Sequence, residues 1–160
     1  MFREMRRSRQ RLDYARAEEI LRRAPHGVLA VLGDGGYPYA VPLSFAYEDG
    51  HIYIHCARAG HKLDALRRCA KASFCAVERD DVVPEEFTTR YVSAIAFGQA
   101  RELADDVEKC AALRLLCRKY CPALPDEAVE AAIERDWAGV NILDFEVESL
   151  SGKQARELIS

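Results

Sequence analysis

Two hydrophobic periods alternate along the chain and predict its secondary structure. Apolar side chains occupy every second position in residues 39–47 and in residues 51–56, which is typical of half-buried β-strands. Glycine-containing turns precede both runs. The pattern predicts six strands in all: 27–33, 37–48, 51–56, 72–78, 91–103 and 139–150. We expect the first three to form an antiparallel meander, residues 79–90 to form a loop, and Gly98 to mark a bulge or bend.

Outside the strands, apolar residues recur at the helical spacing of three and four positions. Four segments are expected to be helices, with helix-start or helix-stop residues at their ends: 13–27, 60–72, 105–121 and 125–137. In the third segment, the spacing predicts one apolar face. Its members are Val107, Cys110, Leu113, Leu116, Cys117 and Tyr120.

The order of these elements indicates the fold class. Most strands are adjacent in the sequence and joined by tight turns, unlike the strand–helix alternation of a doubly wound parallel sheet. A small antiparallel barrel hides its strand edges by closure. We therefore predict a mainly β protein with peripheral helices (α+β), built as a six-stranded antiparallel split β-barrel. The 160 residues suffice for a single domain, residues 1–160.

Composition and charge narrow the functional classes. The net charge of −3 and the pI near 5.8 argue against nucleic acid as the main partner. No apolar run reaches the roughly 18 residues of a membrane helix and no signal-peptide segment follows the first arginines, so we expect a cytoplasmic protein without a membrane partner. The six cysteines fall within strand or helix patterns, where a reduced thiol acts as a small hydrophobic residue.

Residues 1–12 stand apart because they are strongly basic. Five arginines fall within the first eleven residues. This segment is either an anion-binding arm or a solvated, partly ordered terminus. Such runs are more often solvated, so the sequence favours the second interpretation.

Candidate chemistry is concentrated where His55, Cys56, His61 and Lys62 fall within eight positions. No C-x₂-C pair or H-x₃-H repeat frames these residues, and adjacent strand positions place His55 and Cys56 on opposite faces. A metal site is therefore not predicted. The same separation, together with the lack of a third orienting group, argues against a Cys–His nucleophile.

A phosphate-binding site explains more of this stretch. The chain leaves a strand, passes Gly60 and begins a helix near His61, and the first turn of a helix offers free N–H groups and the positive end of the dipole. Lys62 stands in this turn, although a cation there opposes the dipole. A bound phosphate would offset that cost. The alternative is a lysine that is simply exposed to solvent.

These stretches also carry a resemblance to a known family. "VPLSFAYEDGHIYIHCARAGHKLDALRR", "RYVSAIAFGQAREL" and "ILDFEVESLSGK" resemble the FMN-binding split-barrel proteins related to pyridoxamine 5′-phosphate oxidase. Within that family they are most similar to the branch that includes the 5-nitroimidazole-resistance (Nim) proteins. The likeness runs from about residue 21 to residue 153. It implies a homodimer with two FMN sites, each between the subunits.

The resemblance further implies a set of site residues. The backbone of residues 41–44 would border the isoalloxazine ring, where Pro42 interrupts the ladder and frees neighbouring polar groups. His61 and Lys62 would hold the FMN phosphate, and His55, beside the ring, is the candidate catalytic residue. The full set implied for the cofactor is Val41, Pro42, Leu43, Ser44, His55, Cys56, His61, Lys62, Ser93 and, from the partner chain, Trp137.

Three functions are open at this point. The first is an FMN-dependent oxidoreductase with a nitroreductase-like reaction on a small acceptor, in which the flavin carries the electrons. The second is a non-catalytic flavin or haem carrier, with His55 as the axial ligand in the haem case. The third is a DNA-associated regulator using the basic arm, which the acidic remainder disfavours. The ending "SGKQARELIS" lacks the Arg-Leu-x-Pro pattern of the oxidase, so a pyridoxamine 5′-phosphate oxidase-like activity is a weaker alternative.

Overall fold

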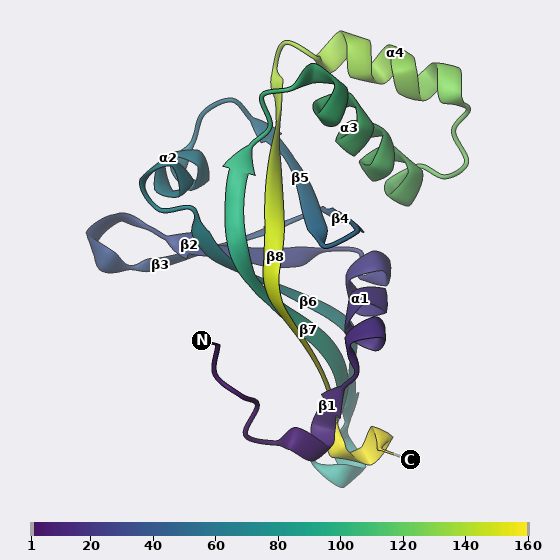
Figure 1. Cartoon of the computed structure of the whole chain (residues 1–160). Coiled ribbons are helices and arrows are strands. Elements are labelled where there is room, and N and C mark those ends of the chain that lie inside the picture. Colours follow the sequence, from purple (N-terminus) through teal and green to yellow (C-terminus); the bar gives the residue numbers. More distant parts are fainter. Residues whose placement is uncertain (1, 160) are drawn as a thin grey trace.

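A computed structural model describes residues 2–159 as one curved antiparallel sheet flanked by helices (Figure 1). The strands are β1 (Arg11–Leu12), β2 (Gly27–Leu32), β3 (Pro38–Leu43), β4 (Ala46–Glu48), β5 (His51–Ala57), β6 (Lys71–Val83), β7 (Thr88–Glu102) and β8 (Val140–Gln154). The α-helices are α1 (Tyr14–Arg23), α2 (His61–Arg68), α3 (Asp106–Tyr120) and α4 (Asp126–Asp136). Short 3₁₀ turns cover Ser8–Gln10, Asp34–Gly36, Pro84–Glu86 and Arg156–Leu158.

The strand order explains how the sheet curls. The hydrogen-bonded order is β3-β2-β6-β7-β8-β5-β4, with β1 added alongside β8. Strands β3 and β4 therefore end the path on opposite sides, yet only Ser44 and Phe45 separate them in the chain. Three residue steps reach at most about 11 Å, so the two end strands must lie close together. The sheet is thus bent into a barrel that stays split between β3 and β4, which confirms the predicted split-barrel fold.

The number and pairing of strands differ from the prediction. The structure has eight strands in residues 2–159, because β1 is an added two-residue strand and the predicted strand 37–48 divides in two. Strand β3 pairs with β2, whereas β4 pairs with β5, so the expected three-strand meander is wrong. Residues 79–90 are mostly not a loop, since β6 and β7 continue as an exposed two-stranded ribbon closed by a 3₁₀ turn.

Tyr120, near the end of α3, fixes the link between β3 and β4. Its hydroxyl accepts a hydrogen bond from the backbone N–H of Phe45 (2.9 Å) and donates one to the carbonyl of Pro25 (2.7 Å). Phe45 is fully buried and packs edge-on against Phe74 in the barrel core. The last turn of α3 thus holds the chain at the point where the barrel is split.

The helices cover the barrel at different places. Asp13 caps α1 by accepting a hydrogen bond from the N–H of Arg16 (2.8 Å), and α1 buries Ala17, Ile20 and Leu21. Helices α3 and α4 lie together at one end of the molecule, while β1 and the tip of the β6–β7 ribbon lie at the other (Figure 1). All six cysteines are free thiols. No helix in residues 2–159 is long and apolar enough to cross a membrane.

The buried face of α3 differs in part from the predicted one. Leu113 and Leu116 are buried as expected, but Val107 is 78% exposed. Lys109 is buried instead, and its ammonium group lies 4.2 Å from the centre of the Trp137 ring. A cation–π contact of this kind lets a lysine occupy a position that an apolar pattern assigns to a hydrophobic residue.

We expect Lys119 to make the stability of the folded protein depend on pH in the alkaline range. Its ammonium group lies 3.8 Å from the centre of the Phe45 ring, and burial lowers the pKa of Lys119 from 10.5 to about 8. Between these two pH values the unfolded chain binds more protons than the folded protein, so this group makes stability rise with pH. We expect Lys119→Met to remove that rise, because methionine keeps the apolar stem without titrating.

The test is urea unfolding of both proteins at about pH 7, 9 and 10. The stability of wild type relative to Lys119→Met should increase steadily from about pH 8 upward. A difference that stays constant over this interval contradicts the lowered pKa.

Candidate functional site

The edge strand β3 carries three of the predicted cofactor-binding residues. It pairs with β2 along one edge, and no other strand in residues 2–159 pairs with its second edge. Val41 and Leu43 are half-buried and pack against the barrel core, whereas Pro42 is exposed. Ser44 follows in the link to β4 and is half-buried. Backbone polar groups on a free strand edge are available to a ligand.

The start of α2 lies directly beside β3. The His61 ring stacks on the Tyr39 ring with 4.2 Å between their centres, and His61 Nε2 lies 3.5 Å from a carboxylate oxygen of Asp34. Gly60 precedes the helix with a φ of 141°, a backbone conformation that favours glycine. No side chain caps this helix start. Its first N–H groups therefore have no side-chain acceptor, as the phosphate hypothesis requires.

Lys62 is the second residue of α2. It is half-buried and forms no ion pair or hydrogen bond with the described part of the chain. Burial raises the pKa of the Cys56 thiol. The positive charge of Lys62 is close enough to oppose part of that rise. Cys56 is therefore a protonated, buried thiol. The structure thus places the start of α2, which carries His61 and Lys62, against β3 through the contact of His61 with Tyr39.

His55 faces another part of the surface. Its side chain is exposed while that of Cys56 is 7% exposed, which confirms that the two point to opposite faces. His55 lines a hollow of about 470 Å³, formed with Cys56, Ala57, Arg135, Asp136, Gly139 and Val140. None of these residues belongs to β3 or α2. Within residues 2–159, no group of three His, Cys, Asp or Glu side chains is placed to hold a metal ion.

Ser93 lies on the outer face of the sheet. Residues directly opposite in an antiparallel ladder point to the same side. One row of this outer face runs through Pro42, Val28, Cys75, Ile95 and Ser151. The next row runs through Ala40, Ala30, Ser73, Phe97 and Ser149. Ser93 lies two positions before Ile95 on β7 and pairs with Val77 and Lys153.

This outer face carries no charged side chain in the two rows through Ile95 and Phe97, although Lys153 lies beside Ser93. The members of these two rows are small or apolar, and Ile95 and Phe97 are 41% and 42% exposed. Adjoining exposed apolar side chains are candidates for an interaction surface, and Phe97 is already stacked on Phe2 with 5.5 Å between the ring centres. Pro42 of the free edge and Ser93 border the same face, so two of the predicted cofactor residues from distant strands share it.

Trp137 lies elsewhere in its own chain. It follows α4, packs over Lys109 and joins the apolar cluster between α3, α4 and β8. A contact between Trp137 and the cofactor of a partner chain stays a prediction.

A polar cluster around Asp144 is absent from the site residues predicted from the sequence. This carboxylate is 2% exposed, lies 2.7 Å from Nδ1 of His51 and accepts a hydrogen bond from the Arg101 guanidinium (2.9 Å). The three residues line a hollow of about 410 Å³ with Tyr53. Burial and the nearby Asp144 charge raise the pKa of Tyr53. The sequence does contain a signal for this cluster: Asp144 is an acidic residue inside the apolar run of β8. A buried carboxylate needs polar partners, so such a residue predicts a polar cluster around it.

Comparisons with known proteins decide the family. The family model described as pyridoxamine 5′-phosphate oxidase matches residues 13–154 of the chain. The chain belongs to this family. No curated protein sequence matches it.

Solved structures show the same fold. A candidate 5-nitroimidazole antibiotic resistance protein from Bacteroides thetaiotaomicron is 25% identical, with a TM-score of 0.75 over 90% of this chain and 86% of that chain. A conserved hypothetical protein from Mycobacterium tuberculosis is 17% identical, with a TM-score of 0.82 over 97% and 92%. A FAD- and haem-binding protein from Mycobacterium smegmatis is 24% identical, with a TM-score of 0.76 over 92% and 74%.

Proposed function

We propose that this protein binds FMN and acts as an oxidoreductase that reduces a small acceptor, in the manner of a nitroreductase. The observation that carries the proposal is the contact between β3 and α2: an uncapped helix start with Lys62 lies against a strand with a free edge. A phosphate at the helix start would meet a cation and free N–H groups. The ring of the same ligand would lie further along β3, bonded by backbone groups of Val41 to Ser44.

The length of β3 is compatible with this arrangement. Tyr39, which contacts His61, lies two to five residues before the positions proposed for the ring. At about 3.4 Å per residue this separation is roughly 7–17 Å. The ribityl chain of FMN separates its phosphate from its ring by a length within this range. The features that could bind phosphate are confined to the start of α2. FMN ends in a single phosphate and suits this site better than FAD, in which the phosphates are followed by adenosine.

The outer face supports a homodimer with the cofactor between the subunits. Exposed Ile95 and Phe97 would be buried by a second copy, and burial of apolar surface is the main driving force for association. Pro42 lies at the rim of the same face. A ring held at β3 would therefore be covered by the partner, and the hollow at His55 or the loop at Trp137 of either chain could complete its pocket.

The acceptor class is suggested by one relative. The Bacteroides protein with 25% identity is a candidate 5-nitroimidazole resistance protein. The flavin would supply the electrons to such an acceptor, while the protein binds and orients both partners.

The visible spectrum of the purified protein tests the cofactor. We expect flavin bands, a released ligand with the mass of FMN, and a dimer by sedimentation at micromolar concentration. The second step is anaerobic: the reduced protein should be reoxidised by a nitroimidazole. A Soret band would indicate a haem carrier instead. Absence of any chromophore after reconstitution with FMN, or a monomer that retains FMN, would contradict the proposal.

A role for His55 in the redox step is part of this proposal. An imidazole titrates near neutrality and can donate a proton to the anion formed when the acceptor is reduced. We expect His55→Gln to bind FMN normally but to reduce a nitroimidazole at least about tenfold more slowly and without a pH dependence between about pH 5.5 and 8. The matched control is His26→Gln, since His26 is also an exposed histidine. An unchanged rate and pH profile in His55→Gln would exclude the catalytic role.

A further inference from the structure

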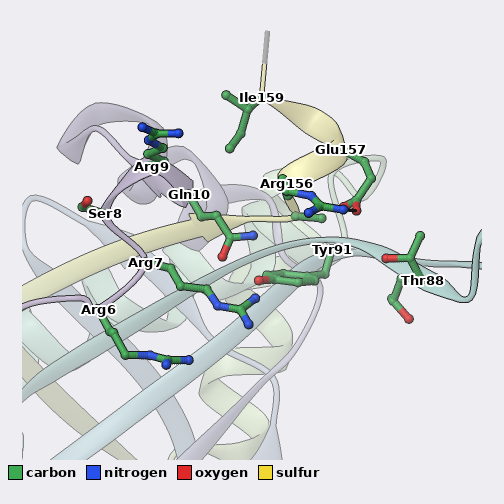
Figure 2. Close-up of a pocket in the computed structure, with 12 residues that line it drawn as sticks. Arg6, Arg7, Ser8, Arg9, Gln10, Thr88, Tyr91, Arg156, Glu157 and Ile159 are labelled. Carbon is green, nitrogen blue, oxygen red and sulfur yellow. Dashed lines mark ion pairs between the residues drawn. The ribbon is translucent and has the colours of Figure 1, made fainter.

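A large cavity lies at the end of the barrel opposite α3 and α4, where the N-terminal arm, β7 and the C-terminal 3₁₀ turn meet (Figure 2). Its volume is about 990 Å³. The lining residues are Arg6, Arg7, Ser8, Arg9, Gln10, Thr88, Thr89, Tyr91, Ala155, Arg156, Glu157 and Ile159. No residue of β3 or α2 contributes, so this cavity is separate from the site proposed for FMN.

The cavity is strongly positive. Four arginines line it against a single carboxylate, that of Glu157. Glu157 lies 3.6 Å from Arg156, and Arg6, Arg7 and Arg9 form no ion pair with the described part of the chain. Several uncompensated guanidinium groups around one cavity favour an anion, and arginine suits phosphate in particular because its planar fork can donate two parallel hydrogen bonds.

Gln10 provides an independent indication that the cavity holds a ligand. Its side chain is only 7% exposed, and its carbonyl oxygen Oε1 has no hydrogen-bond partner among residues 2–159. Figure 2 shows its amide directed into the space between Arg7, Tyr91 and Arg156. An unpaired buried acceptor destabilises the fold. A hydroxyl or amino group of a ligand would satisfy it, whereas a bare phosphate without a proton donor would not.

Tyr91 connects the cavity with the outer face of the sheet. It lies two residues before Ser93 on the same side of β7, a separation of about 7 Å. The ammonium group of Lys153 lies 5.4 Å from the centre of the Tyr91 ring. The cavity thus offers an aromatic side chain, a hydrogen-bond acceptor and a cluster of cations within one volume.

We propose that this cavity binds a nucleotide that carries at least two phosphates. The arginines bind the phosphates, Gln10 Oε1 accepts a hydrogen bond from a hydroxyl or amino group of the nucleoside, and Tyr91 contacts its base. The volume lies at the upper end of the range of small-molecule pockets. A small ligand agrees better than a nucleic acid with the net charge of −3 and with the grouping of four arginines around one cavity.

Calorimetric titration of the 160-residue chain with ADP tests the proposal, with adenosine and inorganic pyrophosphate as partial probes. We expect ADP to bind at one site per chain and adenosine to bind far more weakly. Arg7→Ala and Arg156→Ala should each weaken ADP binding roughly tenfold or more. The matched control is Arg3→Ala, an exposed arginine of the same arm that does not line the cavity, and it should change ADP binding little.

Gln10→Met separates a ligand-binding role from a structural one. Removing an unpaired buried acceptor should raise the melting temperature. The same substitution should weaken ADP binding and leave pyrophosphate binding nearly unchanged. A raised melting temperature with reduced ADP affinity is the expected signature.

Four results would overturn the proposal. The first is no ADP binding up to about 1 mM, a concentration near the weak limit of specific sites. The second is an equal loss of affinity in Arg3→Ala, and the third is binding of a single-stranded oligonucleotide without binding of ADP. The fourth is a loss of bound flavin in Arg7→Ala together with the loss of ADP, because the cavity would then belong to the flavin site.

Discussion

Replacement of Lys62 by alanine is expected to weaken FMN binding roughly ten- to a hundred-fold while riboflavin binding changes little. A charge-assisted contact between an ammonium group and a phosphate contributes about 1.5–3 kcal/mol, which corresponds to this range of affinity. Lys62 has no competing ion pair among residues 2–159, so its charge is available to a ligand at the start of α2. Riboflavin lacks the phosphate, so its affinity for the protein should change little.

Fluorescence titration of the flavin-free protein with both ligands provides the measurement. The matched control is Lys71→Ala, because Lys71 is an exposed lysine at the start of β6 and lies outside the first turn of α2, nine positions after Lys62. Equal losses for FMN and riboflavin would show that Lys62 supports the fold or the ring rather than the phosphate. A loss in Lys71→Ala as large as in Lys62→Ala would show only a general effect of charge.

The barrel and the helix start could be predicted because each has a local signal. The alternation in β5, the glycine before α2 and the acidic cap of α1 all determine structure over a few residues, so the sequence shows them directly. The bulge at Gly98 is also a feature with a local signal, the glycine itself. The register between β7 and β8 shifts between Phe97 and Gly98 as expected.

The errors arose where partners distant in the sequence decide the outcome. The alternation of residues 37–48 is continuous across Ser44, so nothing local shows that Phe45 is held by Tyr120, 75 positions away, while the two halves pair at opposite ends of the sheet. The sequence predicts a loop at residues 79–90, where the structure has a two-stranded ribbon. A hairpin exposed on both faces needs no apolar alternation, since its backbone hydrogen bonds suffice to continue the ladder.

In the candidate site, too, the locally determined features could be predicted and those that depend on distant partners could not. The start of α2 and the edge strand were correctly placed from turns, prolines and glycines. The separation of His55 from β3 depends on the curvature of the whole sheet, and the Asp144 cluster depends on pairing between β5, β7 and β8. The sequence favours a solvated terminus for basic residues 1–12, yet residues 6–10 of this arm form one wall of a cavity whose other walls come from β7 and the C-terminal turn.

Gly98→Ala is expected to produce the largest loss of stability of any single substitution considered for this chain. A Cβ atom at Gly98 would overlap the backbone carbonyl oxygen of Glu146 on β8 and lie 3.2 Å from the Phe145 ring. Backbone cannot move aside as a flexible side chain can, so β7 and β8 would have to separate at the centre of the sheet. Overpacking of this kind costs about 3 kcal/mol or more, which lowers the melting temperature by roughly 6–12 °C in a protein of this size.

Gly139→Ala is the matched control for this prediction. Gly139 lies in the turn between α4 and β8, and the nearest atom to a Cβ there is the Asp136 carbonyl oxygen at 3.8 Å, an ordinary contact distance. Its stability should stay within about 0.5 kcal/mol of wild type. Thermal unfolding followed by circular dichroism compares the two variants. If Gly98→Ala has the same melting temperature as Gly139→Ala and wild type, β8 must be able to shift at the bulge. The close approach of the two strands at Gly98 would then not be a requirement of the fold.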